Sequence, residues 1–205
     1  SQPDGAERGG HRHRTAGIDR HRLDHRHGLA DQGAVPTLEL ADDLRVQGQF
    51  GLQHGIDIPV ARCFAFVGAT LPLDGHFAIG NFIGDALAGN DVHVSGDGSP
   101  LRSYLYGADL ASWLQVILLG GQHGRAYNVG SDQAISIAEL AGRVRDTLAP
   151  GAAVRIARGG DDKALRNRYI PAIDRARHEL ALDAWTPLEQ AIRLTAECAT
   201  SEPQT

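Results

Sequence analysis

Hydrophobic residues begin to follow a regular pattern near Phe50, and from there the chain alternates predicted strands with predicted helices. Residues 58–67 (IPVARCFAFV) form a nearly continuous apolar run between glycines, which is typical of a strand buried on both faces of a parallel sheet. Residues 77–88 place apolar side chains at helical spacing, and Gly89-Asn90 ends this predicted helix. The alternation predicts an α/β fold. Further strands are expected at 92–94, 126–129 and 153–157, and further helices at 109–119, 137–148, 174–182 and 187 onward.

Several polar residues mark where these helices begin. Ser136 and Glu139 form an S-x-x-E capping box, and Thr186 and Glu189 form a second one with proline at the first helical position. Asp109 and Asp174 are expected to cap two more helices. The helix after Asp109 (LASWLQVILL) is apolar nearly all round, which predicts that it is well buried.

The first 48 residues differ from the rest of the chain. Residues 8–27 contain six arginines and five histidines against two aspartates and show no hydrophobic period. Three interpretations stay open: a disordered or non-native tail, a basic arm that contacts nucleic acid, and a metal site. Donors for such a metal site would be His11, His13, His21, His25 and His27.

Composition narrows the functional classes. The 205 residues are 42% hydrophobic and carry a net charge of −5, which argues against a protein that acts wholly by binding nucleic acid or a membrane surface. No apolar run approaches the ~20 residues of a membrane span. The two cysteines, Cys63 and Cys198, suggest no disulfide framework, so a cytoplasmic location is expected. The sequence has no methionine and one lysine, Lys163.

Five segments, in the same order as in one known family, resemble the C-terminal half of the extended short-chain dehydrogenase/reductases. These are the NAD-dependent nucleotide-sugar epimerases and dehydratases, which include dTDP-glucose 4,6-dehydratase and UDP-glucose 4-epimerase. The resemblance implies the end of a Rossmann-like parallel sheet followed by a small α/β substrate domain. The matching segments are ARCFAFVG (61–68), FAIGNFIGDALAG (77–89), VSGDGSPLRSYLYGADLASWL (94–114), GRAYNVGSDQAISIAELA (124–141) and IPAIDRARHELAL (170–182).

The resemblance also implies roles for individual residues. In the family's G-D-G-x-x-x-R block the arginine binds the diphosphate of the sugar nucleotide, and here it is Arg102. A guanidinium suits this task because it can donate two parallel hydrogen bonds to phosphate. For a second phosphate arginine, Arg158 is the nearest candidate, with Arg166 and Arg168 as rivals.

Three more positions match the family's binding sites. Phe77 and Val94 fall where relatives line the pocket for the nucleotide base, although both also suit ordinary core positions. Cys63 lies on the strand that passes the nicotinamide ring in relatives, where it could equally act as a small hydrophobic residue. Many relatives carry an asparagine that contacts substrate two positions later, where this chain has Ala65.

Two motifs that the family's chemistry requires are not found in this sequence. A G-x-x-G-x-x-G loop after a strand holds the NAD pyrophosphate, but the nearest string, Gly48-x-x-Gly51-x-x-x-Gly55, has the wrong spacing. The Y-x-x-x-K dyad supplies the acid/base tyrosine, but Gly159 stands four residues before Lys163. We therefore expect residues 1–48 to be a disordered or non-native leader, read in the wrong frame of a GC-rich gene, and residues 50–205 to be the nucleotide-sugar-binding part.

Three functions remain as hypotheses. The first is a partial NAD-dependent epimerase/dehydratase that acts on a nucleoside-diphosphate sugar through a transient 4-keto intermediate and is inactive alone. The second is a non-catalytic fragment that binds the nucleotide sugar, or that pairs as a homodimer or with the missing nucleotide-binding half. In the third, the His/Arg-rich arm is the functional part and binds a metal or nucleic acid. No membrane partner is expected, and under the first two hypotheses no nucleic-acid partner either.

Overall fold

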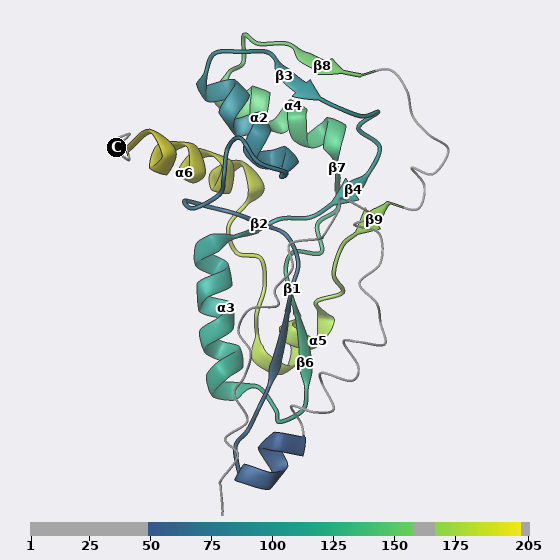
Figure 1. The fold of residues 1–205 in the computed structure, drawn as a ribbon, viewed down its shortest axis with the longest axis vertical. Coiled ribbons are helices and arrows are strands. Elements are labelled where there is room, and N and C mark those ends of the chain that lie inside the picture. Colours follow the sequence, from purple (N-terminus) through teal and green to yellow (C-terminus); the bar gives the residue numbers. More distant parts are fainter. Residues whose placement is uncertain (1–48, 158–166, 202–205) are drawn as a thin grey trace, which may run out of the picture. The chain divides into compact units, whose positions relative to one another are not determined.

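The computed structural model describes residues 49–157 and 167–201 (Figure 1). Residues 49–54 are helical. The strands that follow are β1 (Val60–Cys63), β2 (Phe66–Val67), β3 (Val92–Val94), β4 (Leu101–Arg102), β5 (Leu105–Tyr106), β6 (Ala126–Val129), β7 (Ile135–Ser136), β8 (Val154–Ile156) and β9 (Arg168–Tyr169). The helices are α2 (Ala78–Leu87), α3 (Gly107–Gly120), α4 (Ile137–Leu148), α5 (Asp174–Leu180) and α6 (Leu188–Ser201). The predicted α/β class is confirmed.

Most strand pairs are parallel, as the alternation of strands and helices predicts. β1 pairs with β6, β2 with β5, and β3 with β8, all in parallel. A three-stranded sheet has the order β7-β4-β9, in which β4 is antiparallel to β7 and parallel to β9. The apolar run 58–67 is therefore two short strands with different partners, because the chain leaves β6 after Cys63 and joins β5 at Phe66.

Two hydrophobic clusters hold these elements together. The first joins α2, α4 and α6 to β3 through fully buried side chains such as Ile83, Val92 and Ile192. The second packs α3 and α5 against β6, with Trp113 and Tyr127 at 0% exposure. Figure 1 shows α3 lying along the β1–β6 pair.

Helix α3 differs from the prediction that it is well buried. Asp109, Trp113 and Ile117 form its buried face. On its other face Leu118 and Leu119 are 73% and 87% exposed. The described residues thus cover only one side of this apolar helix.

The predicted helix caps are confirmed at one position and wrong at two others. The side chains of Ser136 and Glu139 form the reciprocal capping box at the start of α4. Asp109 lies in the first turn of α3, which begins at Gly107, and its carboxylate instead accepts hydrogen bonds from the Thr186 N–H (2.9 Å) and hydroxyl (3.0 Å). Asp174 likewise lies in the first turn of α5, after an N-cap at Ile173. The Asp109–Thr186 contact joins α3 to the segment before α6.

Candidate nucleotide-sugar site

Residues 96–99 (GDGS) form a tight turn that precedes β4. The Asp97 carboxylate accepts hydrogen bonds from the Ser99 N–H (3.0 Å) and hydroxyl (2.9 Å), and these bonds lower the pKa of Asp97. Gly98 has φ +75°, and a Cβ there would lie 2.6 Å from the Cβ of Ala138. Its carbonyl accepts from the Ala138 N–H at 2.9 Å. Position 98 requires glycine because its φ is positive and because the first turn of α4 leaves no room for a Cβ.

Arg102 ends β4 in the middle of the three-stranded sheet. It lies opposite Ile135 of β7 and Tyr169 of β9, and it is half-buried. Its Nη1 donates to the Leu101 carbonyl (2.9 Å) and the Asn167 carbonyl (3.0 Å), and its Nη2 donates to Asn167 Oδ1 (2.7 Å). All three acceptors are neutral. Among the described residues Arg102 has no ion pair, so no carboxylate there compensates its positive charge.

An aromatic contact links the carboxyl end of β1 to the strand beside Arg102. The rings of Phe64 and Tyr169 have centroids 4.8 Å apart and are tilted by 33°. Phe64 directly follows Cys63, and Tyr169 is the β9 residue opposite Arg102. The end of β1, which the resemblance assigns to the cofactor, thus contacts the strand that adjoins the expected diphosphate arginine. No motif in the sequence assigns a binding role to Asn167 or Tyr169.

The other predicted binding residues have different surroundings. Phe77 is 58% exposed at the N-cap of α2, whereas Val94 is 3% exposed within the first hydrophobic cluster. Their roles at a base pocket stay predictions. Arg168 is exposed and lies opposite Leu101, one position from the Arg102–Tyr169 pair. Arg158 and Arg166 lie outside the described residues, as do the five histidines of the N-terminal segment.

Cys63 is exposed at the end of β1, and partial burial of its thiol raises the thiol's pKa. A raised pKa keeps the thiol in its neutral form near pH 7, in which it is a poor nucleophile and a poor metal ligand. Its contact with a nicotinamide ring stays a prediction. The described residues contain no group of three or more His, Cys, Asp or Glu side chains that could hold a metal ion.

Tyr104 is poorly suited to acid/base chemistry at neutral pH, and the Tyr127 hydroxyl has a structural role. Burial raises the pKa of Tyr104 to about 12, although the Arg102 charge acts in the opposite direction. Tyr127 is fully buried, and its hydroxyl donates to Glu179 (3.1 Å) while it accepts from the Gln122 N–H (3.2 Å). The Tyr127 hydroxyl therefore connects β6 to α5.

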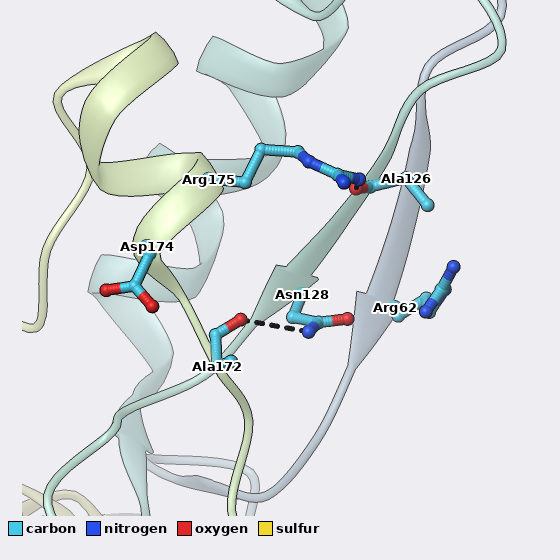
Figure 2. A pocket seen from close by; sticks show the side chains of 6 residues that line it. All are labelled: Arg62, Ala126, Asn128, Ala172, Asp174 and Arg175. Carbon is cyan, nitrogen blue, oxygen red and sulfur yellow. Dashed lines mark hydrogen bonds between the residues drawn. The ribbon is translucent and has the colours of Figure 1, made fainter.

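A small cavity lies beside the β1–β6 pair (Figure 2). It has a volume of about 270 Å³ and is lined by Arg62, Ala126, Asn128, Ala172, Asp174 and Arg175. Asn128 Nδ2 donates to the Ala172 carbonyl (2.9 Å), and Arg175 Nη1 donates to the Ala126 carbonyl (2.6 Å). The wall is polar because Arg62 and Asn128 are directly opposite each other on adjacent strands.

Comparison with known proteins shows which family the chain resembles. Residues 46–130 match the model of the NAD dependent epimerase/dehydratase family. The predicted resemblance is confirmed. Over 145 residues the chain is 28% identical to UDP-glucuronic acid decarboxylase 6 of Arabidopsis thaliana, a match that covers 71% of this chain and 41% of the relative. The chain thus spans less than half of the length of this curated relative.

Solved structures of epimerases and dehydratases share the fold. UDP-glucose 4-epimerase from Thermotoga maritima, determined with UDP-glucose, matches with a TM-score of 0.68 at 19% identity, over 78% of this chain and 51% of that one. dTDP-glucose 4,6-dehydratase from Bacillus anthracis, determined with NAD, matches with a TM-score of 0.63 at 20% identity, over 77% and 49%. NAD is therefore a cofactor within the family, as predicted.

The described residues do not by themselves fit the pyrophosphate of NAD. Gly51 lies within the helical segment 49–54, where a Cβ would approach the His123 ring to 2.5 Å, and Gly55 follows that segment with φ +64°. Gly51 thus allows close packing against His123, and Gly55 adopts the positive φ that ends the helical segment. Neither glycine precedes a helix N-terminus that could bind a phosphate. Gly48 lies outside the described residues.

Proposed function

We propose that this chain contributes the nucleotide-sugar-binding part of an NAD-dependent epimerase/dehydratase. In this proposal residues 50–205 comprise the last strands of a Rossmann-like sheet and a small substrate domain, and residues 1–48 are a separate leader. The ligand is a nucleoside-diphosphate sugar. One observation carries the proposal: Arg102, at the family's diphosphate position, has a guanidinium held by neutral acceptors and paired with no described carboxylate.

The chemistry of this site follows from that geometry. A half-buried guanidinium attracts phosphate more strongly than an exposed one, because less water screens it. Arg158 is proposed as the second phosphate ligand, and Phe77 and Val94 as contacts of the nucleotide base. The aromatic pair of Phe64 and Tyr169 connects the residue that follows Cys63 to the β9 residue opposite Arg102, and the sugar is proposed to lie near this pair.

NAD is the cofactor that the family implies, and Cys63 is the one residue proposed to contact it. When bound, NAD would accept and return a hydride at C4 of the sugar, through the transient 4-keto sugar that gives the family its epimerase and dehydratase outcomes. The 205 residues contain neither a Y-x-x-x-K dyad nor a glycine loop of the required spacing. We therefore assign substrate binding to this chain and no step of the redox chemistry.

Isothermal titration calorimetry of the 205-residue chain with UDP-glucose, and separately with uridine, tests this proposal. We expect UDP-glucose to bind about tenfold or more tightly than uridine, because the diphosphate adds charge-assisted hydrogen bonds that uridine cannot make. The affinity should fall as salt is raised from low concentration. Equal affinity for UDP-glucose and uridine would contradict the proposal, as would no detectable binding of either.

A second proposal, in which the chain pairs with a nucleotide-binding half, is favoured by two surfaces. Within the described residues β1 pairs only with β6, so its other edge has no strand beside it, and parallel sheets of two strands are rarely stable alone. The outer face of α3 exposes Leu118 and Leu119. In this case the chain alone would not bind UDP-glucose, and adding the nucleotide-binding half of a relative would restore binding.

No helix in the described part of the chain is long and apolar enough to cross a membrane.

A further inference from the structure

Asn167 occupies one edge of the Arg102 guanidinium. A guanidinium has five N–H bonds, arranged in a rigid plane. Both hydrogens of Nη1 are used, one by the Leu101 carbonyl (2.9 Å) and one by the Asn167 carbonyl (3.0 Å). One hydrogen of Nη2 is used by Asn167 Oδ1 (2.7 Å). The main-chain carbonyl and the side-chain oxygen of Asn167 thus bind the end formed by Nη1 and Nη2.

The hydrogens that remain lie together on the other edge. Nε–H and the second hydrogen of Nη2 point in nearly parallel directions, and neither has an acceptor among the described residues. This pair of donors has the spacing that matches two oxygens of one phosphate or of adjacent phosphates. Asn167 therefore leaves free the edge that can bind a diphosphate in bidentate fashion.

The chemical nature of Asn167 matters as much as its position. Its two oxygens are neutral, so they orient the guanidinium without cancelling its charge. Its main chain is fixed independently, because the Asn167 carbonyl also accepts from the Leu101 N–H (3.0 Å), next to the β4–β9 pairing. An aspartate of the same shape would bring a carboxylate to the same edge and form an ion pair, which would compete with an anionic ligand.

We propose that Asn167 is a positioning residue that presents the Nε–Nη2 edge of Arg102 to the diphosphate of the nucleotide sugar. This inference rests on the proposed function, since it assumes that Arg102 binds the diphosphate. It assigns a role to a residue 65 positions away in sequence, which the β4–β9 pairing brings to Arg102. The ligand class is a doubly charged diphosphate diester, as in UDP-glucose.

A double-mutant cycle tests the inference, with UDP-glucose and uridine as ligands of the full chain. We expect Asn167→Ala to weaken UDP-glucose binding about fivefold, because Arg102 loses a hydrogen bond that holds its guanidinium in the orientation that binds the diphosphate. Asn167→Asp should weaken it about tenfold or more, because the carboxylate neutralises Arg102. Neither change should alter uridine binding. In an Arg102→Ala background both changes should have almost no further effect on UDP-glucose binding.

Asn90→Asp provides the control for net charge, because Asn90 is exposed and follows α2, outside the β7-β4-β9 sheet. It should leave UDP-glucose affinity within about twofold of the unmodified chain. The inference is overturned if Asn167→Asp binds UDP-glucose as well as the unmodified chain, or if the effects of Asn167 and Arg102 variants are additive. If Asn167→Asp does not fold, the cycle with Asn167→Ala decides.

The failure of the proposed function would look different. In that case the unmodified chain would not prefer UDP-glucose over uridine, or Arg102→Ala alone would leave the UDP-glucose affinity unchanged. Either result would also contradict the positioning role of Asn167. If the unmodified chain prefers UDP-glucose and Arg102→Ala removes the preference, the function stands. The behaviour of the Asn167 variants then decides the positioning role alone.

Discussion

Replacing Arg102 with alanine is expected to weaken the binding of UDP-glucose about a hundredfold. Hydrogen bonds to charged groups contribute roughly 1.5–3 kcal/mol each, and the free Nε–Nη2 edge can make two. Their loss corresponds to about 3 kcal/mol, or two orders of magnitude in Kd. Arg102→Lys should recover only part of the affinity, because an ammonium group keeps the charge but lacks the paired donors. Calorimetric titration of the three proteins measures these differences.

Arg193→Ala is the matched control for this experiment. It removes the same charge from α6, outside the β7-β4-β9 sheet, where the side chain is exposed. We expect a change of about threefold or less, which reflects only the weaker long-range attraction of the diphosphate. If Arg102→Ala and Arg193→Ala weaken binding equally, the diphosphate is attracted by net charge and Arg102 is not its specific ligand.

Replacing Trp113 with alanine is expected to lower the free energy of unfolding by about 3–5 kcal/mol, as for other large buried aromatic residues. Trp113 is fully buried in the second hydrophobic cluster. Its indole Nε1 also donates to the Asp183 carbonyl (2.9 Å), so the change leaves that carbonyl without this donor. Urea denaturation followed by circular dichroism gives the difference directly.

Trp185→Ala is the control for the loss of an indole. Trp185 is 52% exposed and belongs to neither hydrophobic cluster. Its replacement should cost about 1 kcal/mol or less, in line with other surface substitutions. Similar losses for Trp113 and Trp185 would mean that α3 does not pack against β6 as described.

The elements were predictable from sequence where local signals determine them. Ser136 and Glu139 are close in sequence and form their capping box in the structure as predicted. Asp109 carried a similar capping signal, but tertiary packing brought its carboxylate to Thr186, 77 positions away, and their hydrogen bonds replaced the predicted cap of α3. The strand at 58–67 was predicted as one element because an apolar run does not show where a strand changes partners.

The candidate site was predictable only in part. Arg102 was identified because it belongs to a contiguous motif that resembles the family's. Asn167 and Tyr169 were missed because their relation to Arg102 and Phe64 depends on the pairing of β4 with β9, which no local pattern of the chain records. The burial of Val94 also depends on the packing of α2 and α4 around β3. The proposed roles of Phe77, Val94, Cys63 and Arg158 stay predictions.

A crystal structure of the 205-residue chain with UDP-glucose is the most direct test of diphosphate binding by Arg102. We expect diphosphate oxygens within hydrogen-bond distance of Arg102 Nε and Nη2, at about 2.7–2.9 Å, with Asn167 still bound to Nη1 and Nη2. A diphosphate bound elsewhere, for example between Arg62 and Arg175 in the cavity beside β1 and β6, would contradict the assignment of Arg102 as the diphosphate ligand.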